Sequence, residues 1–184
     1  MGKDASELGR GLVRILETGD RALAADVVHA DFRNREAAVS PRACSIPGPA
    51  GVLASGGLDA HRLQRAAFPY HRDCHEDDRV WVRLRMQGKH SGPFVRFRDG
   101  ALDRAVAPTG REIDFEQMHV LGLRDGKVIS HEAVRDDVTM LGQLGVFPAE
   151  PTGMFRMVGW RLTGQAKRAA ERVTAQAAEA AAQV

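Results

Sequence analysis

A long β-hairpin predicted between residues 111 and 145 constrains the fold of this chain more than any other stretch. Apolar residues alternate with polar or small ones along its first arm, and Asp125-Gly126 is a typical hairpin turn. Two histidines, His119 and His131, stand where a purely structural strand would carry valine or isoleucine. We therefore expect this hairpin to carry the chemistry of the protein as well as part of its core.

The length of the turn decides which residues face each other across the hairpin. A two-residue turn places His119 opposite Glu132, whereas a three-residue loop that begins at Arg124 places it opposite His131. We favour the longer loop, because it gathers the odd-numbered residues on one mostly apolar face, as a small-molecule pocket requires. That face comprises Ile113, Phe115, Gln117, His119 and Leu121 of the first strand and Ile129, His131, Ala133 and Arg135 of the second.

Three helices are predicted before the first long strands. Asp4 and Glu7 have the spacing of a capping box, and a second helix starts near Asp20. A third helix is expected from Pro49 to Phe68, where Pro69 stops it. The apolar face of the first helix comprises Leu8, Leu12, Ile15 and Leu16.

Two segments without helical periodicity are predicted to border the pocket. Residues 35–49 are rich in proline and form a loop over its mouth, and residues 94–110 form a second lid. The segment His71–Glu76 contains two histidines and a cysteine. On a strand these side chains point to opposite sides, so we expect no metal site there.

The alanine-rich end of the chain predicts a helix from about Gly164 to Ala182. It follows a stretch that lacks the patterns of the preceding domain. We therefore divide the chain into an α+β barrel domain at residues 1–150 and a C-terminal helical extension at residues 151–184.

Composition excludes several classes of function. A formal charge of +2 arises from 26 basic and 24 acidic residues spread along the chain, which argues against nucleic-acid or membrane partners. No apolar run approaches the length of a membrane span, and the N-terminus lacks the apolar core of a signal peptide. Two cysteines, Cys44 and Cys74, form no disulfide framework. These features predict a cytoplasmic protein.

The stretch EQMHVLGLRDGKVISHEAVRDDVTMLGQLG, residues 116–145, resembles the closing hairpin of the SnoaL-like polyketide cyclases, or ester cyclases, of the nuclear-transport-factor-2-like superfamily. The motif GKHSG at residues 88–92 and the turn at residues 108–111 fall in the same order as in that family. The resemblance runs from about Leu8 to Phe147. It implies an α+β fold, a cone-shaped barrel of curved antiparallel strands wrapped by three helices, with the C-terminal helix as an addition. It also implies a homodimer.

The same resemblance implies a chemistry. In these cyclases a histidine that matches His119, and an aspartate two residues after the histidine that matches His131, perform acid–base catalysis of an aldol closure without a cofactor. Ala133 stands at the aspartate position in this chain. Asn34 matches an asparagine that enters the cavity, although a turn residue bonded to its own backbone explains it equally well.

From the residues themselves, we expect His119 to be the general base, because burial favours a neutral imidazole. His131 could orient it, Arg135 could stabilise an enolate oxygen, and Asp136 could hold either of them. No metal and no cofactor are predicted. The predicted substrate-binding residues are Asn34, Phe115, Gln117, Leu121 and Ala133.

Three functions fit this pattern. The first is a cyclase or isomerase, of isomerase or lyase type, that acts on an oxygenated apolar small molecule of secondary metabolism. The second is an epoxide hydrolase or epoxide-opening cyclase that uses Arg135 with Asp136 or Glu132. The third is a non-catalytic ligand-binding module, which Ala133 favours. A reading in which the histidines are core groups and Arg135 and Asp136 form an ordinary ion pair also remains open.

Overall fold

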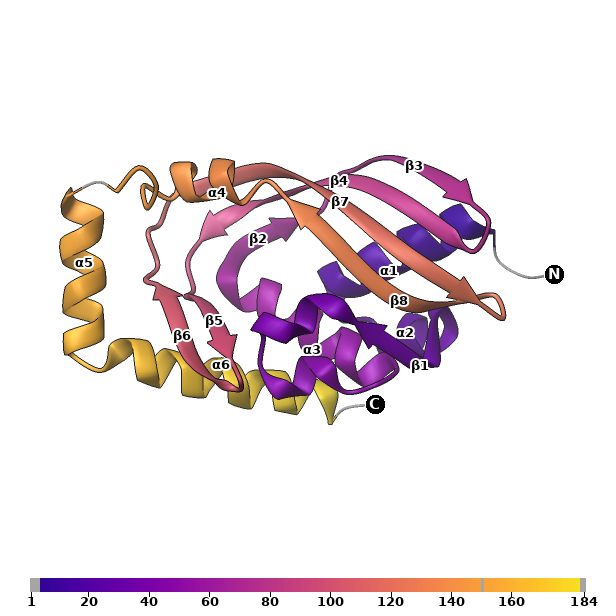
Figure 1. The fold of residues 1–184 in the computed structure, drawn as a ribbon, viewed down its shortest axis with the longest axis horizontal. Helices are drawn as coiled ribbons and strands as arrows, with labels where there is room; N and C mark the ends of the chain where they lie inside the picture. The colour runs from indigo at the N-terminus through magenta and orange to yellow at the C-terminus, as the bar shows by residue number, and fades with distance from the viewer. Residues whose placement is uncertain (1–3, 150, 183–184) are drawn as a thin grey trace.

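The computed structural model of the protein describes residues 4–149 and 151–182. A curved sheet folds over three helices, which lie against its concave side (Figure 1). The α+β architecture predicted from the sequence, with an additional C-terminal helix, is confirmed. The three helices are α1 (Ala5–Thr18), α2 (Arg21–Val27) and α3 (Pro49–Arg62).

The strands form one large sheet and one separate hairpin. The large sheet has the order β1-β8-β7-β4-β2, and β3 also pairs with β4. All of its pairs are antiparallel except β1 with β8, which is parallel. The strands are β1 (Val28–Asn34), β2 (Leu63–Ala67), β3 (Tyr70–Glu76), β4 (Arg79–His90), β5 (Phe94–Arg98), β6 (Ala101–Val106), β7 (Glu112–Arg124) and β8 (Lys127–Arg135).

The first helix forms as its sequence predicts. Asp4 is its N-cap and shares a reciprocal capping box with Glu7, and the predicted apolar face is buried. The third helix packs closely on it, because a Cβ atom at Gly56 would lie only 3.0 Å from the backbone oxygen of Leu16. The main core is therefore the space between these helices and the inner face of the sheet.

The prediction that the third helix continues to Phe68 is wrong. The helix ends at Arg62, and residues 63–67 form β2, which pairs with the far end of β4. Strand β4 extends beyond its partner β3, so its edge would expose unpaired backbone groups without β2. The predicted lid at residues 94–110 consists mainly of the β5-β6 hairpin, and residues 35–45 form two short 3-10 helices, η1 (Arg35–Val39) and η2 (Arg42–Ser45).

The central hairpin has the two-residue turn of the first alternative, with Arg124 opposite Lys127, but neither alternative anticipated its register beyond that turn. Its turn has two residues, both with positive φ, 51° at Asp125 and 69° at Gly126, so the favoured three-residue loop is wrong. A bulge at Ile129 then shifts the pairing by one residue. His119 consequently lies opposite Ala133, and His131 lies opposite Leu121.

Most residues predicted to face inward still do so, because the extra residue at the bulge returns the odd-numbered residues that follow it on β8 to the inner face. His131, Ala133 and Arg135 still share a face with the odd-numbered residues of β7. Val128 replaces Ile129 at the inner position beside Leu123. The residues expected to line a pocket therefore do share one side of the sheet.

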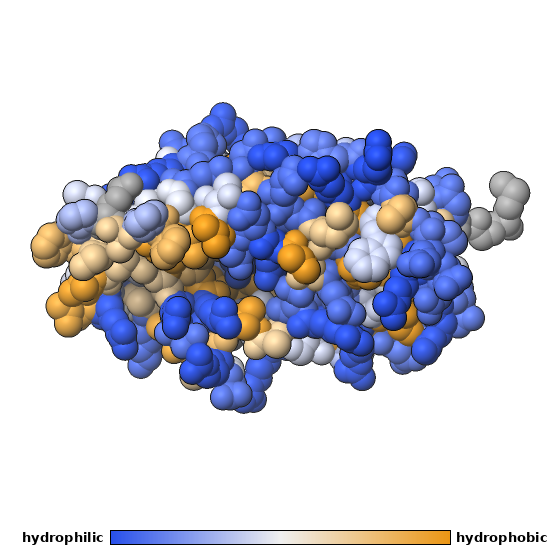
Figure 2. All heavy atoms as spheres, turned by 45° about the horizontal axis from the view of Figure 1, so that its top comes forward, coloured by the Kyte–Doolittle hydropathy of each residue, from blue (hydrophilic) through white to orange (hydrophobic). Residues whose placement is uncertain are grey.

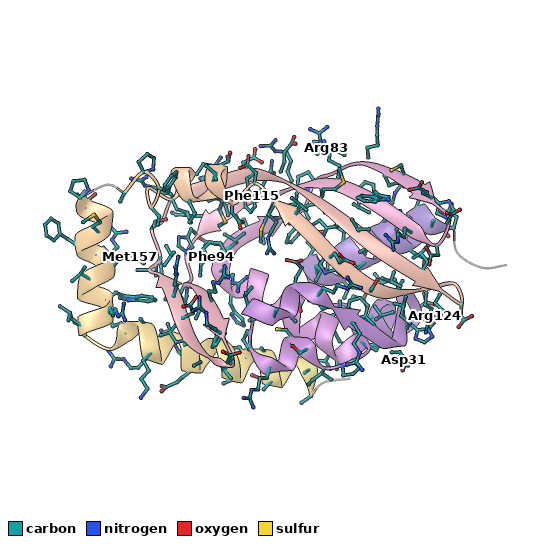
Figure 3. All side chains as sticks on the ribbon, in the orientation of Figure 1. Asp31, Arg83, Phe94, Phe115, Arg124 and Met157 are labelled. Carbon is teal, nitrogen blue, oxygen red and sulfur yellow. The ribbon has the colours of Figure 1, made fainter. Side chains whose placement is uncertain are left out.

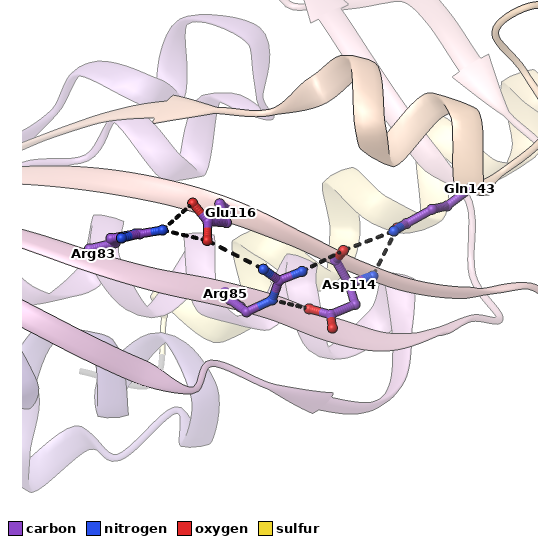
Figure 4. Close-up of polar contacts among 5 residues, drawn as sticks. All are labelled: Arg83, Arg85, Asp114, Glu116 and Gln143. Atoms are coloured by element: carbon purple, nitrogen blue, oxygen red, sulfur yellow. Dashed lines mark hydrogen bonds and ion pairs between the residues drawn. The ribbon is translucent and has the colours of Figure 1, made fainter.

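Charged residues cover the outer face of β4 and β7 (Figure 4). Arg85 Nε donates to Asp114 Oδ1 at 2.5 Å, and Arg83 Nη2 donates to both carboxylate oxygens of Glu116 at 2.7 and 2.8 Å. These contacts lower the pKa of the Asp114 and Glu116 carboxyl groups. Gln143, at the end of α4 (Asp137–Gln143), accepts from the Asp114 backbone N–H and donates to its carbonyl, both at 2.8 Å. The two faces of the sheet thus differ sharply in polarity.

The C-terminal segment adds two helices, α5 (Pro151–Leu162) and α6 (Gln165–Ala181). The second was predicted, and its small apolar residues form another core with α3, η2 and β5. The first was not predicted, and Figure 2 shows apolar side chains gathered at the end of the molecule that it forms. Exposed large apolar residues on α5 are Met154, Phe155, Val158 and Leu162. None of the described helices is long and apolar enough to cross a membrane.

Candidate active site

Four polar side chains meet inside the fold, where β1 ends beside β8. Gln117 and His119 lie on the inner face of β7, His131 lies on β8, and Asn34 is the last residue of β1. The parallel pairing of β1 with β8 puts Asn34 directly beside His131, although 97 residues separate them. Only 5% of Gln117, 5% of His119 and 6% of His131 is exposed. Gln117 and the two histidines are therefore enclosed by the protein, and Asn34 is half-buried.

Hydrogen bonds join these side chains in a single row. His119 Nδ1 lies 2.7 Å from His131 Nε2, and the two rings stack with their centroids 4.9 Å apart. His119 Nε2 lies 2.8 Å from Gln117 Oε1, and His131 Nδ1 lies 3.1 Å from Asn34 Oδ1. The row can pass a proton from one imidazole to the other, since both ring nitrogens at its centre can donate or accept.

Burial keeps both rings uncharged at neutral pH. It lowers the pKa of His119 to about 4, and the positive charge of Arg135 acts in the same direction. The pKa of His131 is also far below its usual value, first through burial and then through His119 and Arg135. A neutral imidazole can accept a proton, so either ring has the protonation state that a general base needs.

Arg135 lies near the pair but is held by a carboxylate. Its Nη2 donates to Glu36 Oε2 at 2.9 Å, and its side chain is 36% exposed. Glu36 Oε1 also accepts from the backbone N–H of Ala133 at 3.0 Å, beyond the point where β1 stops pairing with β8. Glu36 thus places a carboxylate beside Ala133, the position where the resemblance predicted an aspartate.

The structure does not bring Asp136 or Glu132 to the histidines. Asp136 is the N-cap of α4, where its side chain accepts from the Thr139 N–H at 3.0 Å and the Thr139 hydroxyl at 2.6 Å. Glu132 pairs with Arg35 at 3.2 Å on an exposed part of the strand. Arg135 has Glu36 as its ion-pair partner, so the expected contact between Asp136 and Arg135 or His131 does not occur in this arrangement.

Of the remaining predicted residues, Phe115 and Leu121 lie on the inner face with 1% and 0% exposure. Figure 3 shows Phe115 on the opposite side of the sheet from Arg83. Ala133 is half-buried and lies opposite His119. Leu121 lies opposite His131 and Ala133 opposite His119, so both contribute to the burial that lowers the pKa of the two rings.

Three supporting residues were not predicted. Ser55 on α3 accepts from Asn34 Nδ2 at 2.9 Å, and Gln117 Nε2 contacts Met86 Sδ at 3.2 Å. Glu36 donates its backbone N–H to Asn34 Oδ1 at 3.0 Å. Ser55 and Met86 act through contacts between distant segments, which the local sequence does not mark, whereas the bond from Glu36 to Asn34 spans only two residues.

His90 is a third buried histidine, outside the row. Its Nδ1 accepts from the Thr109 N–H at 3.2 Å, its ring packs on Phe94, and burial lowers its pKa to about 4. Within residues 4–149 and 151–182, no group of three or more histidine, cysteine, aspartate or glutamate residues is placed to hold a metal ion.

Two hollows in the described part of the chain lie away from the histidines. One, of about 580 Å³, lies between the start of α1 and the β7-β8 turn and is lined by residues such as His75 and Arg124. The other, of about 80 Å³, lies between α5 and the β6-β7 connection, where Arg111, Arg156 and Met157 meet. His119 and His131 are nevertheless 5% and 6% exposed, so a small molecule reaches them only when neighbouring side chains move.

The sequence matches a known family over most of its length. Residues 6–144 match the sequence profile of the family described as SnoaL-like polyketide cyclase. No curated protein matches the sequence of this chain.

Solved structures share the fold. TsrD from Streptomyces laurentii is 19% identical, with a TM-score of 0.61 over 76% of this chain and 93% of that protein. IdmH from Streptomyces antibioticus, a candidate polyketide cyclase, is 24% identical, with a TM-score of 0.58 over 78% of this chain and 100% of IdmH. A nuclear-transport-factor-2-like protein from Burkholderia thailandensis is 12% identical, with a TM-score of 0.55 over 77% and 98% of the two chains.

Proposed function

The chain belongs to the SnoaL-like polyketide cyclase family, and from this membership we propose that it is a small cofactor-independent enzyme of cyclase or isomerase type. Its substrate is an oxygenated, largely apolar molecule of the polyketide kind. The observation that carries the proposal is the contact of 2.7 Å between two buried imidazoles, His119 and His131. Two neutral rings in direct contact can exchange a proton, as an acid–base pair requires.

In the proposed mechanism, His119 removes a proton next to a substrate carbonyl and His131 shares the charge that results. Arg135, whose guanidinium is partly exposed beside the pair, attracts the developing enolate oxygen once the substrate has displaced part of its contact with Glu36. Phe115, Leu121 and Ala133 provide the apolar wall, and Asn34 and Gln117 the polar contacts.

Epoxide opening by Arg135 with Asp136 or Glu132 has less support. That chemistry needs a carboxylate that reaches the reacting carbon or a water molecule beside it. Asp136 caps α4, and Glu132 pairs with Arg35. Neither carboxylate adjoins the histidine row.

The proposal is tested by native mass spectrometry of the protein purified from cells that make polyketides. We expect a retained small molecule on the wild-type protein and its loss in the variant His119→Ala, His131→Ala. Failure of both proteins to retain any molecule contradicts the proposal. The variant Ala133→Asp distinguishes an enzyme from a ligand-binding module. If the wild type is inactive and the variant gains cyclase turnover, the natural protein only binds its ligand.

We also propose that the protein acts in the cytoplasm as a homodimer. The four exposed apolar side chains of α5 support an interface with a second copy, since a monomer would leave that stripe in water (Figure 2). Light scattering coupled to gel filtration tests this. A dimer that becomes a monomer in the variant Phe155→Glu, Leu162→Glu is expected, and a monomeric wild type overturns it.

A further inference from the structure

One amide at the end of the histidine row has an orientation that cannot reverse. Asn34 Oδ1 lies 3.0 Å from the backbone N–H of Glu36, and a backbone N–H can only donate. At the other end of the amide, Nδ2 donates to Ser55 Oγ at 2.9 Å, while Ser55 donates its own hydrogen to the Gly51 carbonyl at 2.8 Å. A reversed Asn34 would set two donors against each other at Glu36. Its oxygen therefore stays turned toward His131.

This fixed oxygen determines which ring nitrogens carry hydrogen. Because Asn34 Oδ1 also contacts His131 Nδ1 at 3.1 Å, that nitrogen must be the protonated one. In a neutral His131 the other nitrogen is then bare, and it accepts from His119 Nδ1 across 2.7 Å. A neutral His119 that donates from Nδ1 has its only available lone pair at Nε2.

We propose that Asn34 is a positioning residue that makes His119 Nε2 the proton-accepting atom of the pair, and that the Gln117 amide reverses when this atom gains a proton. This inference rests on the proposed acid–base function and specifies which atom performs it. Gln117 is free to reverse because its other partner, Met86 Sδ at 3.2 Å, is a weak acceptor that does not fix its orientation.

The number of ring hydrogens distinguishes a neutral histidine pair from one that has gained a proton. The three contacts that run from Gln117 Oε1 to Asn34 Oδ1 need three ring N–H groups, and two neutral imidazoles have only two. The orientation of Gln117 in the structure, with its oxygen toward His119, is the one that suits a pair with one added proton. The neutral pair requires the NH₂ group of Gln117 to face His119 instead.

The proton-transfer step is balanced without a further reactant. His119 Nε2 takes a proton from a carbon next to a substrate carbonyl, and the electron pair of the broken C–H bond stays on the substrate as an enolate. The bridging hydrogen can then move from His119 Nδ1 to His131 Nε2, which places the positive charge beside Asn34. In the later half of the reaction the bridging hydrogen moves back from His131 Nε2 to His119 Nδ1 as His119 Nε2 returns its proton to the substrate, so both rings end neutral.

The charged groups around the pair keep this proton transient. Arg135 at the end of β8 and the Glu36 carboxylate on η1 adjoin the row, and they form an ion pair with each other at 2.9 Å. The carboxylate is therefore committed to Arg135 and to the Ala133 backbone, and does not hold an imidazolium. Burial and the charge of Arg135 both favour return of the proton.

Nitrogen NMR of the histidine side chains tests the inference without a substrate. Spectra of ¹⁵N-labelled protein that correlate ring nitrogens with ring carbon-bound hydrogens identify the protonated nitrogen of each ring. At neutral pH we expect both His119 and His131 to carry hydrogen on Nδ1. The variant Asn34→Ala lacks the fixed acceptor, so both rings are expected to carry hydrogen on Nε2 instead. His131 then donates to His119 Nδ1, and His119 donates to Gln117 Oε1.

Ser55→Ala is the matched control. It removes the second partner of the Asn34 amide but leaves the Glu36 N–H, so both rings should keep hydrogen on Nδ1, and it gives a result even if Asn34→Ala fails to fold. The inference is overturned if both rings of the wild type carry hydrogen on Nε2. It is also overturned if the hydrogens move to Nε2 in Ser55→Ala but stay on Nδ1 in Asn34→Ala. If both rings carry hydrogen on Nδ1 but the protein retains no small molecule, the proposed function is contradicted and this inference stands.

Discussion

Acid should destabilise this protein through its buried histidine pair, and the size of the effect follows from the pKa of His119. In the unfolded chain an imidazole has a pKa of 6.5, whereas burial lowers that of folded His119 to about 4. Between these two values the unfolded state binds more protons than the folded one, so stability falls as pH falls. The loss begins near pH 6.5 and is complete below about pH 4.

At pH 5 the expected loss from one such group is about 2 kcal/mol relative to pH 7.5, because the unfolded imidazole is almost fully charged there and the folded one is mostly neutral. His131 acts in the same direction. Other groups, His90 among them, also contribute, so the pair must be isolated by comparison with a variant that lacks it.

The assay is urea unfolding, followed by tryptophan fluorescence at both pH values, of the wild type and the variant His119→Gln, His131→Gln. The wild type should lose at least about 2 kcal/mol more than the variant on acidification. If the variant does not fold, the wild-type ring signals in NMR should show no protonation of the pair at pH 5. Equal losses in both proteins, or rings that titrate near pH 6.5, would refute the reasoning.

The remaining predictions concern the scaffold and its contacts. In thermal unfolding, Gly126→Ala should destabilise the protein by about 1 kcal/mol, because the φ of this residue is 69°. Gly159→Ala should stabilise it by up to about 1 kcal/mol, because this glycine lies in a helix with no atom near the added methyl group. Arg85→Ala should lower the urea midpoint slightly, and less in high salt, because its ion pairs with Asp114 and Glu116 are partly exposed; a large, salt-independent loss would contradict this. Glu36→Gln should preserve the Nδ1–H tautomer of His131, since the backbone N–H remains, while amide exchange at Ala133 becomes faster as its acceptor weakens.

Local chemistry was enough to predict much of the scaffold. The Asp4 capping box, the helix that starts after Asp20 and the Asp125-Gly126 turn all depend on residues within a few positions of each other. The bulge at Ile129 was not predicted, because it depends on the pairing between two strands and not on the local sequence. Helix α3 was predicted too long because the need to pair the end of β4 prevailed over helical periodicity.

The candidate site was predictable only in its central part. Alternation placed His119 and His131 on one face, and that prediction holds despite the wrong register. The role of Glu36 was out of reach, because its carboxylate meets Ala133 and Arg135 across 97 and 99 residues of chain. Asp136 lies away from the histidines because its side chain caps α4, a local role that was not predicted from the sequence.

The most direct test of the account is deuterium exchange into a substrate-like ketone. Wild-type protein in D₂O, incubated with a panel of aromatic β-keto esters and polyketide-like diketones, should speed up incorporation of deuterium next to a carbonyl, as measured by mass spectrometry. His119→Gln should lower that rate by about 10²-fold or more. An unchanged rate in His119→Gln would show that this imidazole does not take the proton, and would contradict the account.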